Sequence, residues 1–322
     1  MNHSGGLYGQ KLVDPVLVRI SIITVRHDKR GNMKYFAFVF SGLMVLCFVV
    51  QPTFSEEPRE SLYSQLNRSV IRLEHFESIS QEGSSQVITK NISDGTAFFV
   101  ASKDQLFVVS ARHVVDRPHD LHARVQTKNA RTGEEKVFLL KLSKDKWIYH
   151  TNKGDAETQY VDVAVMRILS LKDWGIVHFL YEPNESPDKK KNQLPAKDAE
   201  PPKPILVFGF PADVGFELAN QHPLGRLGIV SMKAGKRFLK VGRKYAEERA
   251  CLIDVRIFPG NSGSPVMNEM RVFDSEPRLL GLVTATNSSL DFAVMEPVSR
   301  IRETLDQAIN SEAQGSWEEI RQ

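Results

Sequence analysis

Residues 258–266 (FPGNSGSPV) constrain the fold of this chain more than any other stretch. Glycines flank an Asn-Ser pair, and strand-like apolar residues lie on both sides, at 251–253 before the pair and at Val266 after it. The backbone must therefore turn sharply between two strands and leave the hydroxyl of Ser262 exposed. A serine hydroxyl is unreactive at neutral pH without an adjacent base, so a nucleophilic serine here requires a histidine and a carboxylate elsewhere in the chain.

A histidine and an aspartate in unusual surroundings meet this requirement. His113 comes just after the apolar run 106–109, and Asp162 lies inside the apolar run 161–165 (VDVAV). A carboxylate in such a run is costly unless it is hydrogen-bonded or paired, so Asp162 must have a dedicated partner. In one interpretation it caps backbone amides at the start of a strand, and His113 is a hydrogen-bonded core residue. In the other it orients His113 as the base for Ser262.

The order His, Asp, Ser and the motifs around these residues resemble the trypsin-like serine peptidases of the chymotrypsin fold, and within them the HtrA-type bacterial subgroup. The sequence departs from the family pattern at Ala97 and Ser264, where glycines are usual, and Ser264 adds a side chain beside the serine. Few residues follow Asp306, so the PDZ domain of larger members is expected to be absent. The motifs that carry the resemblance are GTAFFV at 95–100, VVSARHVV at 108–115, DVAV at 162–165 and GNSGSPV at 260–266, with weaker matches at 207–211 and 225–231.

The resemblance implies an all-β fold of two packed antiparallel β-barrels followed by a C-terminal α-helix, with the active site between the barrels. It implies a catalytic triad of His113, Asp162 and Ser262, and an oxyanion hole formed by the backbone N–H groups of Gly260 and Ser262. The expected function is an exported serine endopeptidase that hydrolyses proteins or peptides through an acyl-enzyme, with no cofactor and no metal. The alternative is a catalytically silent trypsin-fold module that binds exported proteins or peptides in the same cleft.

The resemblance also suggests a specificity pocket. Arg256, six residues before Ser262, would lie at its base, and Thr284 belongs to the strand 281–285 that would form one wall. An arginine at the base would favour an acidic residue before the scissile bond. The alternative is that Arg256 points outward from its strand.

Changes in composition along the chain predict its organisation. A leader at residues 1–55 is followed by a polar arm at 56–86, which is expected to be a short helix or an irregular segment. Two barrels, at 87–182 and 205–296, are joined by a proline-rich, charged connection at 183–204 that is not expected to contribute to a core. The remaining expected segments are a C-terminal helix at 297–310, a frayed tail at 311–322, and strands at 95–100, 106–110, 137–142, 161–169, 205–210, 227–232, 250–257, 279–285 and 292–295.

The leader contains an uncharged apolar run at residues 35–50, preceded by Lys34. The run is short for a membrane span, which needs roughly 20 apolar residues, but it is typical of a signal-peptide core. We therefore expect export to the periplasm or the medium, with an uncleaved anchor in the cytoplasmic membrane as the alternative. Translation from Met1 and from Met33 both fit the sequence, and the resemblance leaves a homo-oligomer open.

Composition argues against other classes of function. The chain has 42 Lys and Arg residues against 39 Asp and Glu residues, and because they are scattered no nucleic-acid partner is predicted. Its two cysteines, Cys47 and Cys251, cannot form a disulfide framework, and Cys251 is expected to be a buried small hydrophobic residue. His119 and His122 are three residues apart, but no further ligand is close in sequence, so no zinc site is predicted.

Overall fold

The structure is a computed structural model with two compact units, Met1–Pro58 and Arg59–Gln322, and each is described by itself. In the first unit, β1 (Ile22–His27) and β2 (Met33–Phe38) pair as an antiparallel hairpin. The described residues are 22–27, 33–38, 66–80, 87–102, 104–151, 161–181, 194–195, 197–212, 222–233, 240–241, 244–245, 250–268, 278–287 and 292–320.

Most of the apolar run predicted as a signal-peptide core or anchor, from residue 39 to residue 50, lies outside the described residues, as does Cys47. Within the described ranges, no helix is both long enough and apolar enough to cross a membrane.

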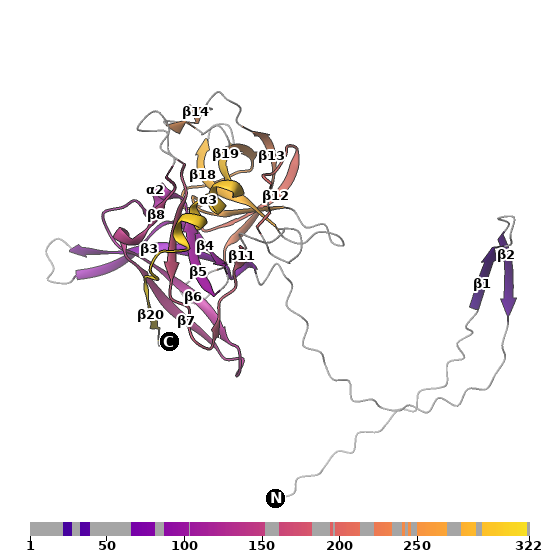
Figure 1. The fold of residues 1–322 in the computed structure, drawn as a ribbon, viewed down its shortest axis with the longest axis horizontal. Helices are drawn as coiled ribbons and strands as arrows, with labels where there is room; N and C mark the ends of the chain where they lie inside the picture. The colour runs from indigo at the N-terminus through magenta and orange to yellow at the C-terminus, as the bar shows by residue number, and fades with distance from the viewer. Residues whose placement is uncertain are drawn as a thin grey trace, which may run out of the picture. The chain divides into compact units, whose positions relative to one another are not determined.

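The N-terminal half of the second unit is a curled sheet (Figure 1). Its described strands are β3 (Val70–Ser80), β4 (Val87–Ser102), β5 (Gln105–Ser110), β6 (Leu121–Asn129), β7 (Glu135–Leu142), β8 (Ile148–Tyr149), β9 (Ala164–Ile168), β10 (Trp174–Gly175), β11 (Phe179–Leu180) and β20 (Ser316–Glu319). The order is β20-β7-β6-β3-β4-β5-β9-β8, with β10 beside β6 and β11 beside β4. β3 is an interior strand, which pairs with β4 on one side and with β6 on the other.

The C-terminal half closes into a barrel, in the order β12-β13-β16-β19-β18-β17. These strands are β12 (Lys203–Gly209), β13 (Leu224–Lys233), β16 (Cys251–Asp254), β17 (Pro265–Asn268), β18 (Leu279–Asn287) and β19 (Phe292–Pro297), and a small hairpin of β14 (Lys240–Val241) and β15 (Lys244–Tyr245) lies outside the barrel order. The predicted all-β class and C-terminal barrel are confirmed, while the N-terminal half is a half-barrel. Cys251 is buried inside the barrel, as predicted, and burial raises the pKa of its thiol to about 12.

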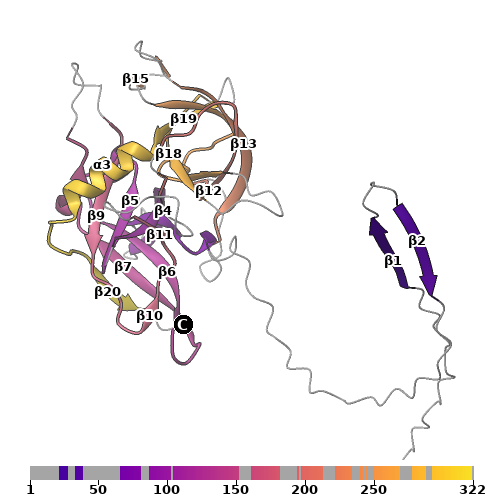
Figure 2. The same cartoon turned by 45° about the vertical axis from the view of Figure 1, so that its right-hand side comes forward.

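The C-terminal helix α3 (Val298–Ala308) connects the two halves (Figure 2). It begins directly after β19, with Pro297 as its N-cap residue. It packs against β9 of the first sheet and β18 of the barrel. The helix predicted at 297–310 is therefore present, and its buried face is formed largely by Val298, Ile301, Leu305 and Ala308.

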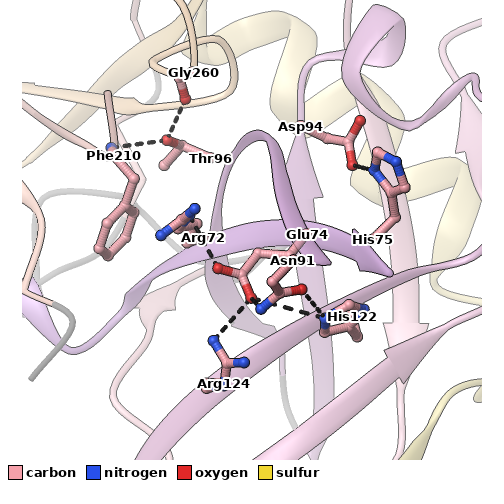
Figure 3. A network of polar contacts seen from close by, with 10 residues as sticks. All are labelled: Arg72, Glu74, His75, Asn91, Asp94, Thr96, His122, Arg124, Phe210 and Gly260. Carbon is pink, nitrogen blue, oxygen red and sulfur yellow. Dashed lines mark hydrogen bonds and ion pairs between the residues drawn. The ribbon is translucent and has the colours of Figure 1, made fainter. Parts of the chain in front are cut away.

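The structure differs from the sequence prediction at residues 56–86. Part of this stretch is β3, an interior strand of the first sheet, instead of a short helix or an irregular arm. A carboxylate in this strand, that of Glu74, is buried because it pairs with two arginines (Figure 3). Glu74 is 1% exposed and contacts Arg72 and Arg124, each at 3.0 Å. Polar sequence therefore does not indicate solvent exposure here.

Two further segments contribute more to the fold than predicted. In the tail at 311–322, β20 pairs with β7, and the indole N–H of Trp317 donates to the carbonyl of Leu169 (2.8 Å). In the connection at 183–204, the residues before Leu194 lie outside the described ranges, but Leu194 is buried in the main core. Each segment is anchored by a single apolar or aromatic residue. Because most of the other residues in these segments are polar, their composition does not predict this anchoring.

His122 on β6 belongs to the buried network around Glu74 (Figure 3). Its Nε2 lies 3.0 Å from Oδ1 of Asn91, and its ring stacks on Phe76 with 3.8 Å between the ring centroids. Burial, followed by the positive charge of Arg124, lowers the pKa of His122 from 6.5 to about 4. The folded protein therefore holds this imidazole neutral at pH values where an unfolded chain protonates it.

We expect the free energy of unfolding to fall as the pH is lowered from 6.5 toward 4, the interval between the two pKa values of His122. The unfolded chain then binds a proton that the folded chain excludes, so the loss is on the order of 2–3 kcal/mol. Urea unfolding at a series of pH values measures it. His122→Gln should flatten this part of the profile, whereas the exposed His222→Gln should retain it. An unchanged slope in His122→Gln would contradict the assignment.

Candidate active site

The turn that carries Ser262 requires glycine on both sides of the Asn-Ser pair. Gly260 and Gly263 have φ angles of +90° and +86°, which L side chains rarely adopt. A Cβ at Gly263 would lie 2.0 Å from the carbonyl oxygen of Thr96, and one at Gly260 would lie 2.5 Å from that of Phe210. The turn therefore packs tightly against β4 of the first sheet and against the end of β12, and the backbone of Ser262 is held between them.

Thr96 on β4 joins the two halves beneath this turn. Its backbone N–H donates to the carbonyl of Ser262 (2.9 Å), and its hydroxyl donates to the carbonyl of Gly260 (2.8 Å). The same hydroxyl accepts the backbone N–H of Phe210 (3.1 Å), as Figure 3 shows. Thr96 is fully buried, so these bonds form out of contact with water. A threonine within a strand has many structural roles, so nothing in the local sequence distinguishes this residue.

His113 and Asp162 are brought together by α2 (Arg112–Val115) and the segment that precedes β9. The ring Nδ1–H of His113 donates to Oδ2 of Asp162 (2.6 Å), and the backbone N–H of His113 donates to Oδ1 of the same carboxylate (2.8 Å). Asp162 is 5% exposed, so its charge depends on these partners. Both interpretations of the sequence apply, since the carboxylate accepts a backbone N–H and also holds the imidazole.

Glu296 on β19 supports Asp162 from the other half. Its carboxylate accepts the backbone N–H of Asp162 (3.3 Å), and both residues are buried. Asp162 itself precedes β9, which begins at Ala164 and not at residue 161 as predicted. The sequence gives no local signal for Glu296, because the contact joins residues 134 positions apart.

Gly95 links the turn of Ser262 to the helix of His113. A Cβ at Gly95 would lie 2.7 Å from Cγ1 of Val114 and 3.0 Å from the carbonyl oxygen of Ser262. The two segments therefore both approach Gly95 at the place where a Cβ would lie. Within the part of the chain that the structure describes, no hydrogen bond joins Ser262 to His113. The structure thus pairs His113 with Asp162 and places the backbone of Ser262 nearby.

Two backbone N–H groups in the turn are available to a ligand. The N–H groups of Asn261 and Gly263 donate to the carbonyls of Phe258 (3.1 Å) and Val283 (2.7 Å). Among the described residues, the N–H groups of Gly260 and Ser262 have no such acceptor. These are the two donors that the resemblance assigns to an oxyanion hole.

Ser264, which replaces a usual glycine, points into the barrel. Its side chain is fully buried, and a Cβ at Gly209 would lie only 2.0 Å from its Oγ. The added hydroxymethyl group therefore occupies the space left by Gly209 on β12 and does not lie on the exposed side of the turn.

Arg256 and Thr284, the two predicted pocket residues, differ in their surroundings. Arg256 is exposed, with its guanidinium carbon 5.4 Å from the ring centroid of Phe258. Thr284 is buried, and its hydroxyl lies 3.4 Å from the carbonyl of Val294 within the barrel. Arg226 on β13, which the sequence analysis missed, lies over the same Phe258 ring at 4.5 Å. Two positive charges therefore flank the start of the Ser262 turn.

Comparison with known proteins gives one family match. A family model described as "Trypsin-like peptidase domain" matches residues 95–273, which is more than half of the chain. A search of the curated proteins finds no match.

Several solved structures are similar at low sequence identity. The HtrA-type protease AlgW, solved with a decapeptide, is 16% identical with a TM-score of 0.45, and the match covers 78% of this chain and 66% of AlgW. Deg5 is 16% identical with a TM-score of 0.44, covering 78% of this chain and 94% of Deg5. The tobacco etch virus protease is 13% identical with a TM-score of 0.42, covering 80% of this chain and 84% of the protease.

The buried hydroxyl of Thr96 provides a test of how the Ser262 turn is held. Thr96→Val keeps the shape but removes both hydrogen bonds of the hydroxyl, the one donated to Gly260 and the one accepted from Phe210, so we expect the free energy of unfolding to fall by about 1–3 kcal/mol. Thr96→Ser keeps the hydroxyl and should cost less, mainly the loss of one buried methyl group. Chemical denaturation of the three proteins measures the difference. Equal losses in both variants would show that the hydroxyl is not the important group.

Proposed function

Because the chain belongs to the family of trypsin-like peptidase domains, we propose that it is a serine endopeptidase whose nucleophile is Ser262. The observation that carries the proposal is the pairing of His113 with the buried carboxylate of Asp162 (2.6 Å) beside the turn of Ser262. This pairing places the proton of the neutral imidazole on Nδ1, so that Nε2 is left as the basic nitrogen.

In the proposed reaction, Ser262 attacks the carbonyl carbon of the scissile peptide bond, and Nε2 of His113 takes the proton from the hydroxyl. Asp162 stabilises the imidazolium that forms and keeps the ring in place through its second oxygen, which accepts the N–H of His113. His113 then gives the proton to the leaving amine, and an acyl-enzyme on Ser262 remains. Water, activated by the same imidazole, hydrolyses the acyl-enzyme and regenerates the serine.

The backbone N–H groups of Gly260 and Ser262 are proposed to bind the oxyanion of the tetrahedral intermediate. The positive φ of Gly260 sets the direction of this peptide segment, and the tight packing against Phe210 keeps it there. Loss of one such donor typically costs about 3 kcal/mol of transition-state stabilisation. Because the donors belong to a backbone that Thr96 anchors, little reorganisation accompanies the reaction.

A protein or peptide is the proposed substrate, and the two arginines beside Phe258 are expected to influence which substrate sequences are cleaved. Arg226 and Arg256 both contact the Phe258 ring, two residues before Gly260. We propose that this positive charge favours an acidic side chain near the scissile bond, whether or not Arg256 lies at the base of a pocket.

Export remains part of the proposal and rests on the sequence alone. The uncharged run at residues 35–50 is typical of a signal-peptide core, and an uncleaved membrane anchor is the alternative.

The second candidate function is a catalytically silent trypsin-fold module that binds exported proteins or peptides. The observation that favours it is that no hydrogen bond joins Ser262 to His113 within the described residues. Hydrogen bonds of this kind are often long in ligand-free active sites and shorten when substrate binds, so the observation does not contradict catalysis.

Labelling with a fluorophosphonate probe distinguishes the two candidates. We expect the wild-type protein to be labelled and Ser262→Ala to remain unlabelled, because only an activated serine reacts with the probe.

Asp162→Asn, which disturbs the tautomer of His113, should lower peptidase activity by about 10⁴-fold.

Ser264→Ala is the matched control, since Ser264 is two residues away and buried, and it should be labelled like the wild type. Wild-type protein that shows no serine-dependent labelling, including in the presence of peptide substrates, would favour the binding module.

A further inference from the structure

Two histidines and an aspartate gather on the first sheet and the segment before β6, outside the candidate active site. His75 lies on β3, Asp94 on β4, and His119 in the segment between α2 and β6. Nδ1 of His75 is 2.5 Å from Oδ2 of Asp94, and Nε2 of His119 is 3.5 Å from Oδ1 (Figure 3 shows the first pair). The two imidazole rings stack, with 3.9 Å between their centroids. Three potential metal ligands therefore converge from three segments.

The atoms of this cluster lie close to the separations that a metal requires. Each residue offers one ligand atom, and these atoms lie within 4.8 Å of one another. Tetrahedral Zn²⁺ with bonds of about 2.0–2.1 Å places its ligand atoms about 3.3 Å apart. The distance from His119 to Asp94 already fits. The distance from His75 to Asp94 must open by a little under 1 Å, as the metal replaces the proton that these two groups share.

Burial and access also suit a metal. The side chain of Asp94 is 8% exposed and that of His119 is 33% exposed, so the carboxylate lies inside and the imidazole lies at the surface. Within the described part of the chain, the buried Nε2 of His119 has no hydrogen-bond partner. A cavity of about 730 Å³, lined in part by His75, His119 and Asp120, leads to the cluster. Lys141 also lines this cavity, but Glu318 pairs with its ammonium (2.6 Å).

We propose that His75, Asp94 and His119 bind a divalent transition-metal ion, with Zn²⁺ as the best match to two imidazoles and one carboxylate. Three protein ligands leave a fourth position for water on the side of the cavity. His122 is not a ligand, because its Nε2 contacts Asn91 (3.0 Å) and its ring stacks on Phe76.

The sequence could not reveal this site. His119 and His122 attracted attention by their spacing, yet only His119 takes part, and its partners lie far away in the sequence on β3 and β4. The polar segment that contains His75 is predicted from its sequence to be a short helix or an irregular arm, and neither places His75 beside Asp94.

Isothermal titration of the full-length, EDTA-treated chain with ZnCl₂ tests the proposal. A Ser262→Ala background prevents self-cleavage and makes the result independent of peptidase activity. We expect one Zn²⁺ per chain, and His75→Ala and His119→Ala should each weaken binding by at least about 100-fold, since each removes a ligand. His222→Ala, an exposed histidine before β13, should bind like the background protein.

Co²⁺ provides a second, spectroscopic readout. The folded background protein should show the visible absorption bands of four-coordinate Co²⁺. His119→Gln, a change at a partly exposed side chain, should lack these bands, and circular dichroism should show that this variant is folded. The proposal is wrong if no metal binds. It is also wrong if binding persists in folded His75→Ala or His119→Gln, or if binding is lost in His113→Ala, which would place the ion in the candidate active site.

Discussion

The buried hydroxyl of Thr96 is the interaction on which the candidate active site depends. The first sheet and the C-terminal barrel come from separate parts of the chain, and Thr96 and Gly260 are 164 positions apart. One side chain on β4 bonds to the carbonyl of Gly260 and to the N–H of Phe210, while its backbone bonds to the carbonyl of Ser262. A polar group that is fully buried must keep both partners, so any shift of one half against the other leaves a donor or an acceptor unpaired.

Asp162 couples the halves in a second way. Its carboxylate holds the ring and the backbone of His113, and its own N–H is held by Glu296 from the barrel. The orientation of the imidazole is thus set by groups on both sides of the interface. Since Asp162 and Glu296 are both acidic and buried, the backbone hydrogen bonds that each makes are needed to stabilise them.

The sequence predicted the parts of the site that have a local signature. A serine between glycines requires a particular turn, and an aspartate in an apolar run requires a partner, so Ser262 and Asp162 could be found from single segments. Residues whose role depends on a distant neighbour could not be found in this way. Threonine is common in strands, so Thr96 does not stand out in the sequence. Glu74 suggests an exposed segment, and only the structure shows that Arg124 lies beside it. The direction of buried polar side chains is decided by the tertiary pairing and not by local pattern.

The candidate active site and the proposed metal site share two segments. Asp94 is two residues before Thr96 on β4, and His119 is six residues after His113. A metal that joins Asp94 to His119 would therefore restrain the segments that follow His113 and precede Thr96. Without a metal, Asp94 is hydrogen-bonded to His75. With a metal bound, the ion would replace the proton between these two side chains. A bound metal would therefore link β4 directly to the segment between α2 and β6.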